Sequence, residues 1–433
     1  MLRKTLILLG CLLASLALTP HQALAGKKAR KLIQAQTEIP DALLLDIGVR
    51  VFNLGLLENP ESAGQDSVSV NFRRLEARYL PYLLTKTLQH SGFWGSVRVA
   101  PESHLADVAV SATILKSTGK YLKLKVVVQD ARGKIWLKKK YKQRADYSSF
   151  YRDETRCDPF QSLYNRIANN LQHVYVELDE EDITRIRTIS RLRFAAELVP
   201  NAFGDILGVN KKGRFQVERL PAADDPMMAR VDAVRLRDHM FVDILQEYYA
   251  DFHAQMHEPY DNYRERSYNR EVIARGIERG DFTQTLAGVG TIAVGAGAII
   301  AGATTAIAVS DGNGSSEAAA NVIMELSASA GASVIESGVE KIKDSRSHRR
   351  HLLQELGDSI DIDVTPVLVR LDGEITRLSG SMETQYANWR EILRQIFTTE
   401  TGPSLEPVDL SVGPRAIISR RMASTLTPAP MEN

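Results

Sequence analysis

The segment Leu286–Val309 constrains this chain more than any other, because it contains no charged residue in a protein that is 25% charged. At about 24 residues it is long enough to cross the hydrocarbon of a bilayer as a helix. Much of it is Gly, Ala and Thr, however, and these residues contribute less to insertion than Leu, Ile, Val and Phe. We therefore predict a membrane-associated segment that is not a secure single span.

Small residues recur through this segment with the spacing of a helix face. Glycines advance in two series with a step of seven, namely Gly288, Gly295 and Gly302, and Gly290 and Gly297. A face without bulky side chains lets two helices approach closely. The second helix is predicted at Glu317–Lys343, where Glu325 and Glu336 make a second membrane crossing costly. The hairpin is therefore expected to embed in a membrane or self-associate, with a water-soluble packed hairpin as the alternative.

The N-terminus has the pattern of a secretory signal peptide. Arg3 and Lys4 precede an apolar stretch over Leu6–Leu18, and Ala23-Leu24-Ala25 supplies small residues for cleavage. We expect an exported protein, located in the periplasm or cell envelope and associated with a membrane. The alternative is lipoprotein processing at Cys11, although the apolar run continues beyond that cysteine.

Cleavage after Ala25 leaves Cys157 as the one cysteine of the mature chain. It cannot form an internal disulfide, so the fold must depend on its hydrophobic core. Cys157 is then buried, free, or available for an intermolecular bridge.

Periodicity predicts a small αβ domain over residues 41–177. A strand signal at Leu43–Phe52 precedes helical spacing at Val68–Leu88 and a short strand at Trp94–Val99. Three alternating runs then predict an antiparallel meander, with strands at Asp107–Lys116, Tyr121–Asp130 and Ile135–Tyr141. A helix is predicted after it at Asp158–Val176. The outward positions of the meander are mostly lysine, namely Lys116, Lys123, Lys125, Lys138 and Lys140. We interpret them as a solvated face that blunts edge pairing, with an anionic lipid or glycan site as the alternative.

This order of elements resembles the small αβ domain of the curli secretion lipoprotein CsgG and the penicillin-binding-protein activator LpoB. The resemblance covers Asp41–Val176. It depends on the order of elements and on the sequence patterns of four stretches, Asp46–Gly55, Arg74–Thr87, Ala106–Ile114 and Val126–Lys138. It implies a non-enzymatic envelope domain, and none of those families' pore or partner-binding residues can be placed on this chain. An uncharacterised proteobacterial exported family resembles three further stretches, Ile189–Pro200, Asp224–Tyr263 and Ile360–Gly402. This second resemblance implies a location but no activity.

A mainly helical domain is predicted at 178–285. It begins with a mixed-charge helix at Leu178–Val199 and a turn, strand and turn at Lys211–Pro221. The longest helical pattern follows at Met227–Met256, with an apolar stripe formed by Val231, Val234, Leu236, Phe241, Ile244, Leu245, Tyr248, Tyr249 and Phe252. We expect Pro259 to end this helix and a charged helix to resume at Tyr268–Arg279.

The C-terminal part combines a β-hairpin and a helix. Pro366–Ser379 predicts the hairpin, closed by the dipeptide Asp372-Gly373, and Thr384–Phe397 predicts the helix. The fold class is thus α+β. The expected organisation is a signal peptide at 1–25, a basic leader at 26–40, the αβ domain at 41–177, the helical domain at 178–285, the glycine- and alanine-rich helical hairpin at 286–343, the β-hairpin plus helix at 344–402 and a disordered tail at 403–433.

His253 and His257 are the one candidate metal pair. They stand four residues apart on the long helix, with Glu247 and Asp251 nearby. The metalloprotease pattern needs Glu directly after the first histidine, and Ala254 stands there instead. We therefore interpret the pair as surface histidines that the helix dipole favours near a helix C-terminus.

Other constellations favour structural interpretations. Five tyrosines could mark a glycan or membrane-interface surface but fit core positions better, and they are Tyr248, Tyr249, Tyr260, Tyr263 and Tyr268. The sequence has no nucleophile elbow and no phosphate-binding loop after a strand, so we predict no catalytic residue and no cofactor.

The charge balance excludes one class of partner. The chain has 54 basic and 53 acidic residues, which gives no electrostatic reason to expect nucleic acid. We expect a non-enzymatic cell-envelope protein that contacts a membrane and binds an envelope partner or its own copies. An oligomeric pore or secretion component is the first alternative, and a hydrolase of envelope polymer is the second.

Overall fold

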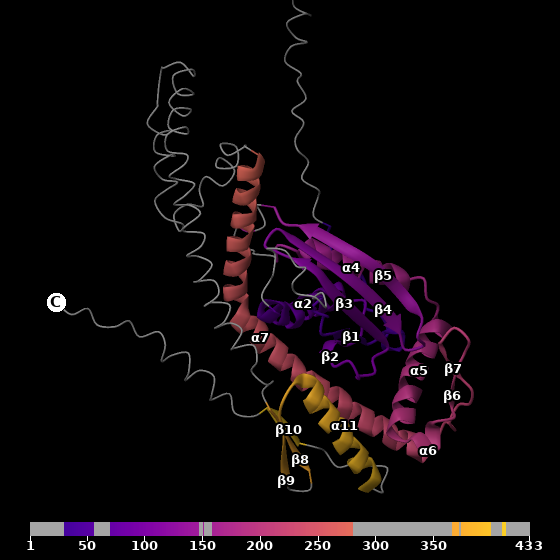
Figure 1. Ribbon diagram of the computed structural model, residues 1–433. Helices are drawn as coiled ribbons and strands as arrows, with labels where there is room; N and C mark the ends of the chain where they lie inside the picture. The colour runs from indigo at the N-terminus through magenta and orange to yellow at the C-terminus, as the bar shows by residue number, and fades with distance from the viewer. Residues whose placement is uncertain are drawn as a thin grey trace, which may run out of the picture. The chain divides into compact units, whose positions relative to one another are not determined.

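The computed structural model describes residues 30–55, 70–146, 150, 158–279, 366–371, 374–399 and 409–412. The predictions for the signal peptide, Cys11, Cys157, and the hairpin at 286–343 with its five glycines lie outside these residues. Within them the fold is α+β, as predicted, with one mixed sheet and two smaller ones (Figure 1).

The central element is a five-stranded sheet with the order β2-β1-β3-β4-β5. β1 (Ile47–Arg50) lies parallel to both β2 (Val97–Ala100) and β3 (Val108–Ser117). β4 (Tyr121–Asp130) and β5 (Ile135–Arg144) continue from β3 as the predicted antiparallel meander. The short 3-10 helix η1 (Asp41–Leu43) precedes β1. β2 and β5 are therefore the two edges of the sheet.

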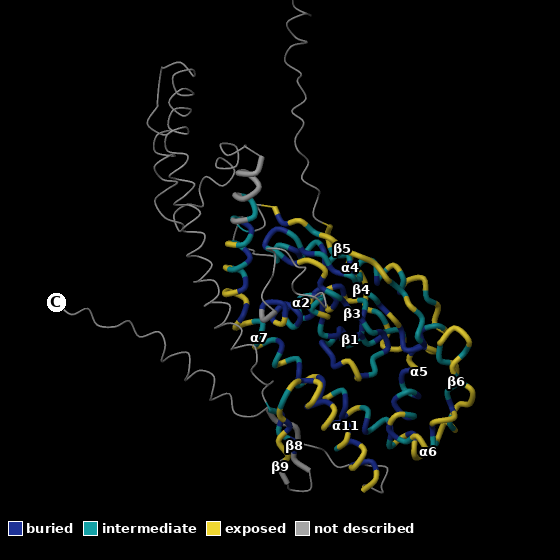
Figure 2. Tube along the Cα trace, in the orientation of Figure 1, coloured by how far each residue is buried: buried dark blue, intermediate teal, exposed yellow. Residues whose placement is uncertain are grey.

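Two helices in contact with each other cover one face of this sheet. They are α2 (Val70–Ser91) and α4 (Gln161–Tyr175), close to the predicted boundaries. Along β3 and β4 every second side chain is buried against them, as the alternating burial in Figure 2 shows. Gly92, with a φ of 70°, follows the last residue of α2 in the left-handed conformation that ends many helices.

The next elements are α5 (Glu180–Leu198), the single turn α6 (Pro200–Phe203) and a small hairpin of β6 (Leu207–Val209) and β7 (Phe215–Val217). Asp179 caps α5 by accepting a hydrogen bond from the Asp182 backbone N–H at 2.7 Å. The sequence predicted one strand here, and β6 is the strand that it missed.

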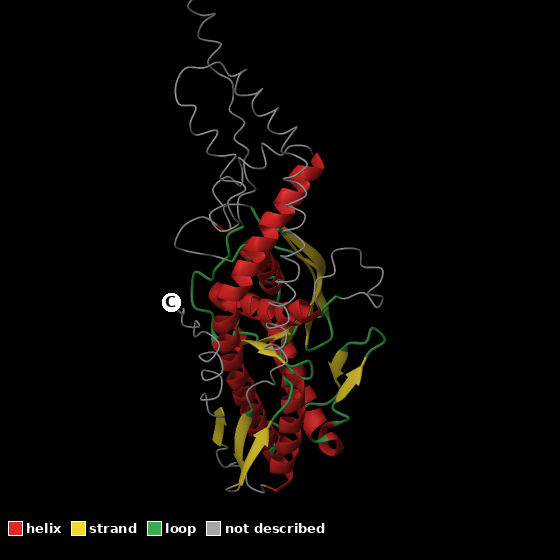
Figure 3. Ribbon diagram, turned by 60° about the vertical axis from the view of Figure 1, so that its left-hand side comes forward, coloured by secondary structure: helices red, strands yellow, loops and turns green. Residues whose placement is uncertain are grey.

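α7 (Pro226–Arg279) is one continuous helix of 54 residues, so the prediction that Pro259 ends the helix is wrong. Figures 1 and 3 show that α7 changes direction part-way along its length, as expected for a proline inside a helix. Met256 and Tyr260, on either side of Pro259, are both buried in the core. These tertiary contacts offset the cost of about 3 kcal/mol that an internal proline imposes.

α7 covers the β2 edge of the sheet. The Gln246 side-chain amide donates to the Val99 carbonyl and accepts from the Val99 N–H, both at 2.8 Å. Arg98 Nη2 donates to Asp243 Oδ2 at 2.9 Å one turn earlier. The Gln246 side chain thus takes the place of a neighbouring strand at this edge.

The C-terminal elements are β8 (Val367–Leu371), β9 (Glu374–Leu378), α11 (Met382–Thr399) and β10 (Asp409–Val412). Leu371 pairs with Glu374, which confirms the predicted two-residue hairpin. β10 pairs antiparallel with β8, so the prediction of a disordered tail is wrong for residues 409–412. An open strand edge at β8 can recruit even a short segment that has little apolar content of its own.

The buried apolar residues form two cores that share α5 and α7. The first core contains most of the sheet, α2, α4, part of α5 and the second half of α7, whereas Val99 and Ala100 of β2 belong to the second core. The second contains the rest of α5, the first half of α7, and α11 with its hairpin. The predicted boundary after residue 177 thus lies within the first core. α7 contacts both cores and is the element that joins them.

Gly119, in the β3–β4 turn, should be intolerant of a side chain. A Cβ there would overlap the Arg264 carbonyl oxygen and the Tyr268 nitrogen of α7. We expect Gly119→Ala to cost about 1–3 kcal/mol of stability and to increase hydrogen exchange in the second half of α7. Gly213→Ala is the control, because no atom lies within 4 Å of its Cβ position. Its left-handed backbone should cost about 1 kcal/mol without affecting α7. Equal exchange in the two variants would contradict the close contact.

Candidate functional site

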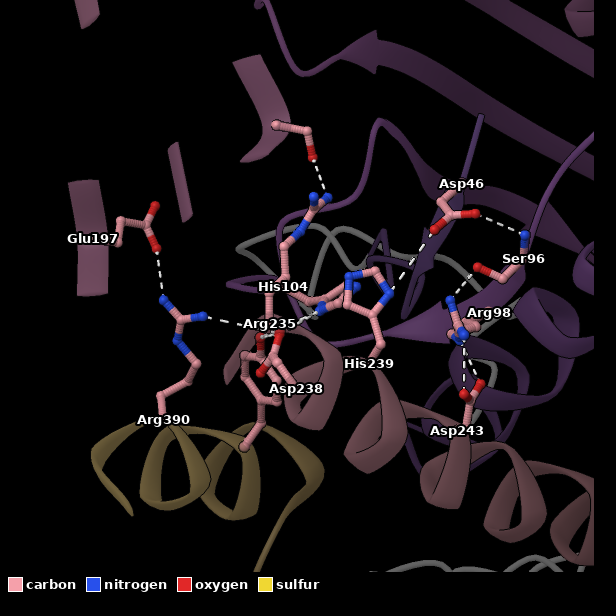
Figure 4. Close-up of polar contacts among 12 residues, drawn as sticks. Asp46, Ser96, Arg98, His104, Glu197, Arg235, Asp238, His239, Asp243 and Arg390 are labelled. Carbon is pink, nitrogen blue, oxygen red and sulfur yellow. Dashed lines mark hydrogen bonds and ion pairs between the residues drawn. The ribbon is translucent and has the colours of Figure 1, made fainter. Parts of the chain in front are cut away.

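Polar side chains from five parts of the fold converge on the first half of α7 (Figure 4). α7 supplies Arg235, Asp238, His239 and Asp243, at the three- and four-residue spacings of one helix face. The strands β1 and β2 with their loops, α5 and α11 supply the partners. We call the part of this cluster around Asp238 the Asp238 junction, formed by Asp238, His104, Tyr386, Arg390 and Glu197.

Asp238 is the centre of the junction and is 1% exposed. Its Oδ2 lies 3.3 Å from His104 Nδ1, accepts from the Tyr386 hydroxyl at 2.9 Å and lies 3.9 Å from Arg390 Nη1. Burial disfavours the charged carboxylate, but the hydrogen bond and charge of His104, together with Arg390, outweigh burial and hold the pKa of Asp238 below its usual value. The junction therefore keeps a buried carboxylate ionised.

Glu197 is the member of the junction contributed by α5, and Arg50 of β1 contacts the junction through the His104 carbonyl. Arg390 Nη2 donates to Glu197 Oε2 at 3.2 Å, and burial raises the pKa of Glu197 despite the nearby Arg390 and Arg193. Arg50 Nη2 donates to the His104 carbonyl at 2.6 Å and so fixes the loop between β2 and β3. Burial lowers the pKa of the Arg50 guanidinium.

His239 lies on the other side of His104, with the two rings 5.7 Å apart. Its Nδ1 is 3.9 Å from Asp46 Oδ2, and the Asp46 backbone N–H donates to Asp107 Oδ2 at 3.1 Å. Burial, with the positive charge of Arg235, lowers the pKa of His239 to about 4. Burial also raises the pKa of Asp107, although the Asp46 N–H and Arg235 oppose it. His239 is therefore a neutral imidazole at pH 7.

Two cavities adjoin the cluster. One of about 340 Å³ is lined by Arg50, His104, Arg193 and Glu197, and floored by β3 and β4. The other, of about 400 Å³, is lined by Asp46, Asp107, Arg235 and His239, with further polar residues. Each is large enough for a small polar ligand.

The predicted metal pair lies elsewhere on α7. The His253 and His257 rings stack with centroids 5.3 Å apart, and His253 also stacks on Tyr79 at 4.8 Å. His257 Nδ1 lies 3.2 Å from the Tyr79 hydroxyl and 3.4 Å from Asp261 Oδ2. The prediction that they lie near a helix C-terminus is wrong, because α7 continues through Pro259. Across the part of the chain that the structure describes, no three His, Cys, Asp or Glu side chains form a metal-binding group.

The prediction that the five tyrosines between residues 248 and 268 fit core positions is confirmed. Tyr249, Tyr260 and Tyr268 are buried, and Tyr248 and Tyr263 pack against the cores. One position of the predicted apolar stripe is wrong, since Leu236 is 64% exposed whereas Asp238, two residues on, is buried. The sequence signal for the junction was the run of charges at 235, 238, 239 and 243 on one helix face.

No family model, no curated protein and no solved structure matches this chain. Among the helices within the described ranges, none combines the length and apolar character needed to cross a bilayer. The site therefore has to be interpreted from its own geometry.

Removal of the Asp238 carboxylate should be strongly destabilising. Asp238→Ala leaves the Arg390 guanidinium and the His104 ring buried without the carboxylate between them, and loss of one partner from a buried ion pair typically costs about 3–5 kcal/mol. Asp232→Ala is the matched control on the same helix, because its ion pair with Arg191 has both side chains at least 40% exposed. It should cost less than about 1 kcal/mol. Urea unfolding of both variants measures the difference, and similar losses would contradict a buried network.

His239 should make stability depend on pH. Between pH 6.5 and about 4 the unfolded chain binds a proton at this position and the folded chain does not, so the free energy of unfolding falls as pH falls. We expect this contribution to decrease by about 2 kcal/mol between pH 7 and pH 5. Urea unfolding at both pH values should show a smaller decrease for His239→Gln than for the wild type. An identical pH dependence would show that His239 titrates normally.

Proposed function

We propose that the chain is a non-enzymatic cell-envelope protein that associates with a membrane through residues 286–343 and holds an envelope partner or further copies of itself. Export follows from the predicted signal peptide. The folded part of the chain would then bind the partner, and the glycine-rich segment would attach the protein to the membrane.

The continuity of α7 is the observation that supports this proposal most. α7 begins in the second core, passes the β2 edge and the first core, and ends at Arg279, a few residues before Leu286. A straight helix of that length would measure about 80 Å. The predicted attachment segment thus follows directly from an element that joins both cores.

α7 is also held to the first core beyond its proline. Arg264 is 2% exposed, and its Nη1 donates to Asp158 Oδ2 at 2.7 Å. The Arg264 guanidinium lies 4.4 Å from the centroid of the Tyr260 ring, and the Tyr260 hydroxyl donates to Glu76 at 3.1 Å. Loss of one partner from a buried ion pair is costly, so these contacts hold the second half of α7 against α2 and against the residues just before α4. A force on residues 286–343 would therefore reach the whole fold.

The order of elements is consistent with the proposal. β1, α2, β2, the β3–β5 meander and α4 follow one another in the order on which the resemblance to CsgG and LpoB depends. An envelope domain of that kind binds and assembles without chemistry, and we extend that role to this chain as a proposal.

A hydrolase of envelope polymer is the second candidate, favoured by the convergence of His104, His239, Asp238 and Asp107 beside two cavities. Burial argues against it. His104 is 3% exposed and Asp238 1%, and each is occupied by internal partners. His104 lines one of the cavities but Asp238 lines neither, so a polymer chain held in a cavity could not reach the two side chains together.

Fractionation of the processed protein tests the proposal. We expect the protein to remain in the membrane pellet after a high-salt wash and to need detergent or alkaline carbonate for release. Gly295→Leu and Gly302→Leu should increase its release, because bulky side chains on a close helix crossing typically cost about 1–3 kcal/mol. Gly314→Leu, in the predicted loop, is the control. Release of the wild type into the soluble periplasmic fraction without detergent would contradict membrane attachment.

A further inference from the structure

The face of the sheet opposite α2 and α4 is strongly cationic. The side chains that alternate with the buried set include five lysines and one arginine on β4 and β5, and Lys116 lies on the same face at the end of β3. We call this set the lysine face, and it consists of Lys116, Lys123, Lys125, Lys138, Lys140, Lys142 and Arg144. The members on β5 are exposed, as is Lys116, and the two on β4 are half-buried.

The strand register places these charges directly opposite one another. Lys125 pairs with Lys140, and Lys123 pairs with Lys142 on one side and with Lys116 on the other. Like charges at paired positions of an antiparallel ladder repel each other and destabilise the sheet. The fold therefore tolerates an unfavourable arrangement at three positions.

No carboxylate offsets this repulsion within the residues that the structure describes, because none of the seven cations forms an ion pair there. Their one described ring contact is Tyr121, whose centroid lies 5.8 Å from Lys116 Nζ and 5.0 Å from Lys142 Nζ. Protection of the sheet edge explains lysines on β5, which is an edge strand. It does not explain Lys123 and Lys125, because at these positions β4 is paired with β3 on one side and with β5 on the other.

One end of the lysine face is attached to α7. In the turn between β3 and β4, the Thr118 hydroxyl donates to Glu271 at 2.9 Å and the Gly119 N–H donates to Ser267 at 3.2 Å. Lys116 and Tyr121 flank this turn. α7 then leads towards the segment Leu286–Val309, for which membrane association is proposed above.

We propose that the lysine face docks on an anionic lipid surface. The inference deepens the proposed function, and it names the lipid class that the folded domain contacts. Lysine ammonium groups bind phosphate headgroups as flexible point charges, and each one near an anionic surface strengthens binding about fivefold. An array of cations without ion pairs, spread over neighbouring strands, suits a lipid surface, which presents many negative charges close together.

The test is co-sedimentation of the full mature chain with vesicles of phosphatidylcholine alone or mixed with phosphatidylglycerol. The variant Lys125→Gln/Lys140→Gln removes one opposed pair from the face. The control Lys86→Gln/Lys139→Gln removes the same charge from α2 and from the helix-covered side of β5, where Lys139 pairs with Val126. We expect the first variant to bind the anionic vesicles about 25-fold more weakly. The control should bind like the wild type.

Thermal unfolding of the variants distinguishes a loss of lipid binding from a folding defect. Because Lys125 and Lys140 repel each other, the first variant should melt at the wild-type temperature or above it. Equal binding of the first variant and the control to anionic vesicles would overturn the inference. So would binding of the wild type to a soluble acidic polysaccharide but not to anionic vesicles.

The two proposals fail in distinguishable ways. If the lysine face docks but residues 286–343 do not attach, binding should require phosphatidylglycerol and be lost in high salt. If only the segment attaches, binding should be equal on both kinds of vesicle and insensitive to the lysine substitutions, which would overturn the lysine face alone.

Discussion

The desolvation of charged groups along α7 is the constraint on which the rest of the structure depends. Asp238 and Arg264 are each almost fully buried, and each is stable in its charged form only because partners from other elements surround it. An ionised group that loses such partners in a low-dielectric interior is costly, so neither half of α7 can move independently of its surroundings. The helix thereby unites two apolar cores that would otherwise share little besides α5.

Elements with strong local periodicity could be predicted from the sequence. The meander, α2, α5 and α11 were placed correctly because their apolar positions repeat every second residue, or every third to fourth, over a whole element. Pro259 misled the prediction, since the local cost of a proline is smaller than the packing of Met256 and Tyr260 on both sides of it. β10 was missed because its strand pairing depends on β8 and not on its own composition.

The Asp238 junction could not be predicted, although its residues are plain in the sequence. Asp238 is separated from His104 by more than a hundred residues and from Tyr386 by 148. Charges at 235, 238, 239 and 243 of a helix normally indicate a solvent-facing side. Only the tertiary fold shows that β2, α5 and α11 cover that side. The opposite applies to the meander, where the lysines were visible but their pairing with one another required the strand register.

The substitution of Gln246 for a neighbouring strand limits how the sheet can grow. A β-sheet extends indefinitely when an unpaired edge offers its N–H and carbonyl groups to another chain. At β2 the Val99 N–H and carbonyl are already occupied by one side chain, and at β5 an incoming strand would have to pass a row of ammonium groups. Close approach of many copies would therefore not convert them into a cross-β aggregate through this sheet, and any ordered assembly has to use another part of the molecule.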